Sequence, residues 1–95
     1  MKLESKVILL IEEFLEEELG EKIEIKIDSK LFGGGGPLDS MALVNLVLEL
    51  EEFVEDEYGK TIILADEKAM SRRTSPFSRV SYLIDYINEK IKTDE

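Results

Sequence analysis

The sequence predicts an all-α fold, a bundle of three long helices and one short helix. Three segments carry apolar residues at helical spacing, over positions 3–19, 40–58 and 78–92, and polar or glycine-containing segments separate them. Four consecutive glycines at positions 33–36 predict a long glycine-rich loop between the first two long helices. A chain of 95 residues has the size of one domain, and we assign residues 1–95 to it.

The first helix is expected over residues 3–19, with its glutamates facing outward and Gly20 ending it. In the segment that follows, Ile23, Ile25 and Ile27 alternate with charged residues, a pattern that locally is typical of a strand. Because a lone strand is poorly stabilised, we expect instead an extended loop that these isoleucines pin to the helices.

The second helix is expected from Ser40 to Tyr58, with Gly59 ending it. Its apolar residues are too many for one face. A core stripe follows the i, i+3, i+4, i+7 rule, and it consists of Leu43, Leu46, Val47, Leu50 and Val54. A second stripe consists of Met41, Val44 and Leu48. We expect this second stripe to be exposed, because a domain this small can hardly bury a helix on both sides; burial on both sides is the alternative.

The C-terminal part is expected to hold the short helix at residues 66–70 and a turn-rich polar segment at residues 71–76. The final helix should begin near Ser78, which would cap it, and run to Lys92. Lys90 and Lys92 would complement the helix dipole in its last turn. The inward residues are expected to be Val80, Leu83, Ile84, Ile87 and Ile91.

The composition limits the classes of function. With 22 acidic and 12 basic residues the formal charge is −10, which argues against nucleic acid as a partner and favours a basic protein surface. The absence of histidine and cysteine removes the commonest general base, thiol catalysis and thiolate metal sites, and it fits a cytoplasmic protein. We see no signal peptide and no apolar run of the ~20 residues that a membrane span needs.

An enzyme and a metal-binding module are both disfavoured. Ser40 has Asp39 beside it but neither a histidine nor an adjacent lysine as base. The glycine run lacks the Gly-Lys-Ser/Thr ending of a phosphate-binding loop. The acidic run at residues 49–57 does not match a calcium-binding loop and is expected to be a solvated face.

Two motifs carry a family resemblance. Residues 38–41 (Leu-Asp-Ser-Met) precede an apolar and acidic helix, and residues 77–80 (Phe-Ser-Arg-Val) open the final one. In this order, and in a chain of this size and charge, they resemble the acyl carrier proteins. The resemblance implies that Ser40 carries a covalent 4'-phosphopantetheine arm, which a phosphopantetheinyl transferase attaches from coenzyme A. Asp39 and Met41 would support the attachment.

The resemblance further implies a monomeric, non-enzymatic carrier of acyl thioesters. It would serve acyl-loading and acyl-processing enzymes of fatty acid, lipid or polyketide-type biosynthesis, and Met41, Val44 and Leu48 would bind these partners. Two alternatives remain open. One is an aminoacyl or peptidyl carrier, and the other is a non-modified helical interaction module in which Ser40 only caps its helix.

Several positions depart from the family pattern and suggest a specialised pathway. Met41 stands where leucine is usual, and Ala42 and Asn45 stand on what we expect to be the solvent side, where relatives in fatty acid synthesis usually have acidic residues. Ala65 stands where proline is common, and the segment around positions 72 and 73, both arginine, is more basic than is usual.

Overall fold

The computed structural model describes residues 2–33, 35–64 and 76–93, and within these residues it contains three α-helices and no β-strand. They are α1 (Lys2–Leu19), α2 (Ser40–Tyr58) and α4 (Val80–Thr93). The predicted all-α class is confirmed, and so are the three long helices. The short helix expected at residues 66–70, and residues 71–75 of the turn-rich segment, lie outside the described residues.

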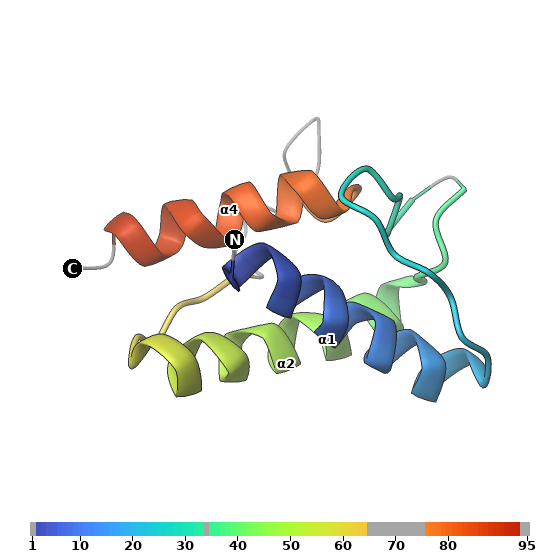
Figure 1. Cartoon of the computed structure of the whole chain (residues 1–95), viewed down its shortest axis with the longest axis horizontal. Coiled ribbons are helices and arrows are strands. Elements are labelled where there is room, and N and C mark those ends of the chain that lie inside the picture. The colour runs from blue at the N-terminus through green and yellow to red at the C-terminus, as the bar shows by residue number, and fades with distance from the viewer. Residues whose placement is uncertain (1, 34, 65–75, 94–95) are drawn as a thin grey trace.

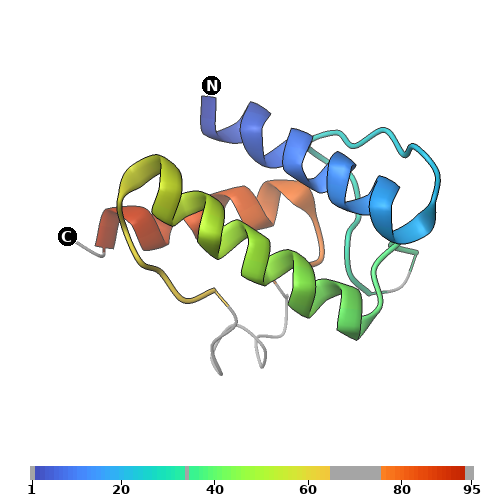
Figure 2. The same cartoon turned by 90° about the horizontal axis from the view of Figure 1, so that it is seen from below.

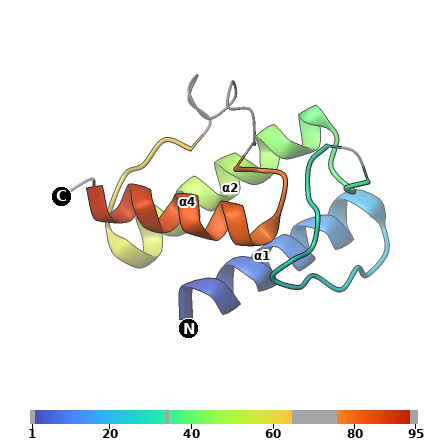
Figure 3. The ribbon, with the colours of Figure 1, turned by 90° about the horizontal axis from the view of Figure 1, so that it is seen from above.

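Helix α1 packs against both other helices; in Figure 1 it crosses in front of α2, and α4 lies above the two. Helices α1 and α2 run antiparallel, so that Lys6 near the start of α1 forms an ion pair with Glu57 near the end of α2. The views from below and from above show the same arrangement (Figures 2 and 3). The backbone of α1 approaches both α2 and α4 more closely than these two approach each other, while buried side chains of all three helices form one core.

One face of α1 is buried, and the residues that bury it are Leu3, Val7, Ile11, Phe14 and Leu15. The end of the helix is as predicted. Gly20 takes a positive φ of 76°, and its N–H donates to the Glu16 carbonyl at 2.9 Å. This left-handed position favours glycine because a side chain there would be strained.

Backbone hydrogen bonds fasten the loop between α1 and α2 to the start of α4. Leu31 N–H donates to the Ser78 carbonyl at 2.9 Å, and Phe32 N–H donates to the Phe77 carbonyl at 3.1 Å. Leu31 is fully buried. We refer to these contacts, together with the bond from Val80 N–H to the Ser29 carbonyl, as the loop clamp.

The three alternating isoleucines of the loop differ in how far they are buried. Ile25 is buried and Ile23 packs partly against the core, but Ile27 is 40% exposed. The prediction that all three pin the loop is therefore wrong for Ile27. Ile25 N–H donates to a carboxylate oxygen of Glu12 at 2.9 Å, so α1 holds this part of the loop through a side chain rather than through strand pairing.

The loop crosses itself just before α2, and this crossing requires glycine. A Cβ atom on Gly36 would lie 2.3 Å from the Leu31 carbonyl oxygen, which is far closer than atoms can approach. The same carbonyl accepts the N–H of Leu38 at 3.0 Å. The buried Leu31 and Leu38 thus fix the chain immediately before α2 begins.

In α2 the predicted core stripe is confirmed, since its buried residues are Leu43, Leu46, Val47, Leu50 and Val54. The helix ends at Gly59, as predicted, with a φ of 67° and an N–H that donates to the Glu55 carbonyl at 2.9 Å.

The extended segment after α2 joins α2 to α4. Leu64 N–H donates to a Glu51 carboxylate oxygen at 2.7 Å, and the Leu64 carbonyl accepts the hydroxyl of Tyr86 at 3.0 Å. Lys60 Nζ donates to the Ile91 carbonyl at 2.9 Å, near the C-terminal end of α4. Polar side chains therefore connect the two helices that do not touch through their backbones.

Helix α4 begins at Val80, two residues after the expected start at Ser78. Val80, Leu83, Ile84 and Ile87 are buried, and Ile91 packs partly against the core, as predicted. Tyr86 is also buried, which the sequence did not lead us to expect. Its ring meets that of Phe77 edge to face at 6.0 Å, and its hydroxyl is satisfied by the Leu64 carbonyl.

Two leucines on α2 offer a matched test of this packing, because Leu46 is fully buried and Leu48 is 56% exposed. We expect Leu46→Ala to lower the free energy of unfolding by about 2–5 kcal/mol, the usual cost of removing a buried leucine side chain. Leu48→Ala should change it by less than about 0.5 kcal/mol. Urea denaturation of both variants measures the difference, and similar losses would contradict the assigned orientation of α2.

Candidate functional site

The candidate site is the junction between the loop and α2, where Ser40 is the first helical residue and is exposed. Asp39 is the N-cap, with extended backbone angles, and its carboxylate oxygen Oδ1 accepts the N–H of Ala42 at 2.8 Å. The first intrahelical bond runs from Leu43 N–H to the Asp39 carbonyl. The N–H groups of Ser40 and Met41 precede it and have no acceptor within the helix.

The Ser40 hydroxyl forms no hydrogen bond with any residue of the described part of the chain. The interpretation of Ser40 as a helix cap is therefore wrong, because the capping hydrogen bond belongs to Asp39. The sequence could not separate the two, since serine and aspartate are equally common at this position. The hydroxyl is left open to solvent on an otherwise fixed backbone.

This environment suits a phosphate attached to the serine oxygen. The free N–H groups and the positive end of the helix dipole favour an anion there. The first turn of α2 contains no acidic residue, so Asp39 is the one adjacent carboxylate in sequence. Because Asp39 and Ser40 lie directly after the loop crossing at Leu31 and Leu38, the position of the hydroxyl is set by buried residues.

The second stripe of α2 begins beside this hydroxyl. Met41, Val44 and Leu48 are 79%, 50% and 56% exposed, so their predicted exposure is confirmed and burial of α2 on both sides is wrong. An apolar stripe of this kind is a surface on which a partner could pack. That these three residues bind partners, and that Asp39 and Met41 support an attachment, stay predictions.

The positions that depart from the family pattern are not alike. Asn45 is exposed, but Ala42 is half-buried and packs against the core, so the expectation that both lie on the solvent side is wrong for Ala42. Ala65 and the arginines at positions 72 and 73 lie outside the described residues.

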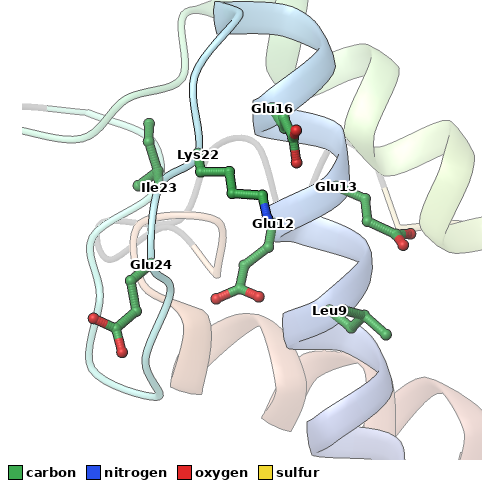
Figure 4. Close-up of a pocket in the computed structure, with 7 residues that line it drawn as sticks. All are labelled: Leu9, Glu12, Glu13, Glu16, Lys22, Ile23 and Glu24. Carbon is green, nitrogen blue, oxygen red and sulfur yellow. The ribbon is translucent and has the colours of Figure 1, made fainter.

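Carboxylates gather where α1 and α2 lie together. Burial raises the pKa of the Glu49 carboxyl on α2, and the negative charges of Glu17, Glu52 and Glu18 raise it further. Two shallow hollows flank the C-terminal half of α1, and Figure 4 shows the one between α1 and the loop. The sequence did not predict these hollows, because the first depends on how the loop returns across α1 and the second on how α1 packs against α2.

Within the described residues, no group of three or more acidic side chains is arranged to hold a metal ion. No described helix combines the length and the apolar content of a membrane span. The chain matches no family model, no curated protein and no solved structure. The interpretation of the site therefore rests on its own geometry and on the motifs around Ser40.

The raised pKa of Glu49 gives a stability prediction with a definite sign. A carboxyl group with a higher pKa in the folded state adds stability at pH below its ordinary pKa, and this stability is lost as the pH rises through the folded value. Glu49→Gln should therefore raise Tm at pH 7 by about 1–3 °C, since interactions between exposed charges are small. The two proteins should converge near pH 4, as thermal melts over this range would show.

The matched control is Glu55→Gln, which removes an equal charge from an exposed position one and a half turns further along α2. It should not reproduce the pH-dependent gain. An equal gain from both variants would mean that net charge, rather than the local contact of Glu49 with α1, determines the effect.

Proposed function

We propose that this protein is a carrier of the acyl carrier type, in which Ser40 holds a 4'-phosphopantetheine arm and presents acyl thioesters to partner enzymes. In this proposal the three described helices, together with a short fourth helix, form an acyl-carrier-like bundle. The partners are a phosphopantetheinyl transferase, which attaches the arm, and acyl-loading and acyl-processing enzymes of fatty acid, lipid or polyketide-type biosynthesis.

The observation that carries the proposal is that the Ser40 hydroxyl forms no hydrogen bond with the residues that the structure describes. It stands exposed at the first residue of a helix whose cap is provided by its neighbour, Asp39. A serine needed only for structure would be expected to make the capping bond itself. The motif at residues 38–41 and the open stripe that follows it support the same interpretation.

Attachment requires a nucleophile from this chain and a base from elsewhere. The Ser40 oxygen forms the new bond to phosphorus, the phosphoanhydride bond of coenzyme A breaks, and the nucleotide portion leaves with the other phosphate. The serine proton passes to a base of the transferase, because this chain contains no histidine and the Asp39 carboxylate already accepts a helix N–H. The arm supplies the thiol that forms the acyl thioester.

In this proposal the remaining residues of the site position the attached arm and bind the partner enzymes. The N–H groups of Ser40 and Met41 favour the negative charge of the attached phosphodiester. Met41, Val44 and Leu48 offer apolar area to the partner next to the attachment point. Asn45 provides no charge where relatives are usually acidic, so the proposed partners dock through apolar contact more than through ion pairs at this position.

The direct test is incubation with coenzyme A and a broad-specificity phosphopantetheinyl transferase, followed by mass spectrometry of the intact protein. The native chain should gain the mass of one phosphopantetheine group. Ser40→Ala should gain none while keeping its Tm within about 2 °C, because the capping bond of Asp39 remains.

Ser5→Ala, which changes an exposed serine on α1, is the control and should be loaded fully. Loading of the Ser40→Ala variant would show that another residue is modified. A native chain that stays unmodified with an active transferase would favour the non-modified interaction module.

The proposed partner stripe can be tested with two equally exposed leucines, Leu48 on α2 and Leu9 on α1, both 56% exposed. Leu48→Glu should lower the transferase kcat/KM about fivefold, because roughly half of a leucine's burial energy would be lost from the interface. Leu9→Glu should leave it unchanged. A large fall in Tm for Leu48→Glu, or equal kinetic losses for both, would contradict the assignment.

A further inference from the structure

Two hollows border the outer ridge of α1, which Glu13 and Glu16 form. The first, of about 490 Å³, lies between α1 and the loop; its lining residues are Leu9, Glu12, Glu13, Glu16, Lys22, Ile23 and Glu24 (Figure 4). The second, of about 520 Å³, lies between α1 and α2; its lining residues are Leu10, Glu13, Phe14, Glu16, Glu17 and Glu49. Because Glu13 and Glu16 line both, one ligand lying across α1 could occupy both.

Each hollow has apolar lining residues, Leu9 and Ile23 in the first and Leu10 and Phe14 in the second, and we refer to these as its floor. Ile23 and Leu10 pack partly against the core, and Phe14 belongs to it. The bond from Ile25 N–H to Glu12 fixes the loop wall of the first hollow against α1. Leu9 adds a side chain that is 56% exposed in the middle of a charged surface. Both hollows therefore offer apolar contacts to the side chains of a ligand, next to their acidic residues.

The rims are strongly negative. Six carboxylates line the two hollows, whereas Lys22, which extends from the loop toward α1 in Figure 4, is the one cation among the lining residues. None of these carboxylates forms an ion pair with a described residue. The pKa of Glu49 is raised by burial first and by the charges of neighbouring glutamates second, so negative charges do repel one another at this rim.

We propose that this face of α1, the two hollows and the ridge between them, is a docking site for a basic amphipathic helix of a partner protein. A helix places apolar side chains three and four residues apart on one face, which suits insertion into neighbouring hollows. Lysine and arginine side chains beside them would reach the carboxylates of the rim. Charge complementarity and the apolar floors together select this occupant.

Other occupants fit the surface poorly. A second copy of this chain would bring a like net charge of −10, and anionic lipids or nucleic acids would be repelled in the same way. The described residues contain no metal-binding group of three acidic side chains. A simple polycation would satisfy the rims but not the apolar floors.

This inference is independent of the carrier proposal. Ser40 and the stripe formed by Met41, Val44 and Leu48 do not line either hollow. A protein that is never modified at Ser40 would still have this docking face, and loading at Ser40 needs no contact with it.

The test uses the full chain and a fluorescent synthetic amphipathic helical peptide built from leucine and lysine. Fluorescence anisotropy gives the affinity, and amide chemical-shift mapping gives the location. The variant Glu13→Gln, Glu16→Gln should bind about tenfold more weakly, because two charge pairs on the shared ridge are lost. Leu9→Gln should bind about threefold more weakly. The shifts should concentrate on α1 and on residues 22–24.

Each variant has a matched control. The change Glu55→Gln, Asp56→Asn removes the same charge from an exposed part of α2, and Leu19→Gln changes an exposed leucine that lines neither hollow. Both controls should keep their affinity within about twofold, and all variants should keep the native Tm, since the changed side chains are exposed.

The proposal is overturned by any of the following results. Equal losses of affinity in the variants and their controls would mean that peptide binding depends only on the net charge of the chain. Equally tight binding of an oligolysine of the same charge would show that the apolar floors contribute nothing. Chemical-shift changes confined to the stripe of α2 would show that the peptide binds at a different site. Dimerisation of the chain in sedimentation without peptide would indicate that a second copy of the chain is the occupant.

Discussion

The loop clamp is the contact on which the position of the candidate site depends. Backbone N–H groups of Leu31 and Phe32 donate to the chain just before α4, and Val80 at the start of α4 donates back to Ser29. Buried backbone groups must be paired, so these bonds are costly to lose. With Leu31 fully buried and Gly36 passing against its carbonyl, the chain can enter α2 from one direction only. The start of α2 is therefore determined by residues some 40 positions later in the sequence.

In the described part of this fold the buried side chains are hydrophobic, and the charged side chains lie outside the core. Among the described residues no polar or charged side chain is buried, and no buried side-chain polar atom lacks a partner. The charged side chains of the described residues therefore lie at or near the surface, where their charge acts on approaching molecules. Where α1 and α2 meet, burial raises the pKa of Glu49, and the neighbouring carboxylates raise it further. A basic partner would relieve that repulsion.

Local rules predicted the helices well and their connections poorly. The two stripes of α2 and the glycine ends of α1 and α2 follow from spacing and from backbone preference, which neighbours in sequence decide. Ile27 was misjudged because alternation of apolar residues does not specify what lies opposite them. The burial of Tyr86 depends on a carbonyl at Leu64, and the two hollows beside α1 depend on the returning loop and on the packing of α2. Such features come from contacts between distant segments, which periodicity cannot reveal.

The candidate site is a prediction from the sequence, and the structure assigns the helix-capping role within it. Asp39 and Ser40 are both good capping residues, so either could have been the structural one. The carboxylate of Asp39 accepts the Ala42 N–H, and this assigns the structural role to Asp39. Serine has a lower helix propensity than alanine, and at the first helical position of α2 no capping hydrogen bond of its own offsets this small loss of stability. An exposed hydroxyl at the start of α2, next to N–H groups that have no acceptor within the helix and on a backbone fixed by a distant clamp, is the basis for the proposal that Ser40 is modified.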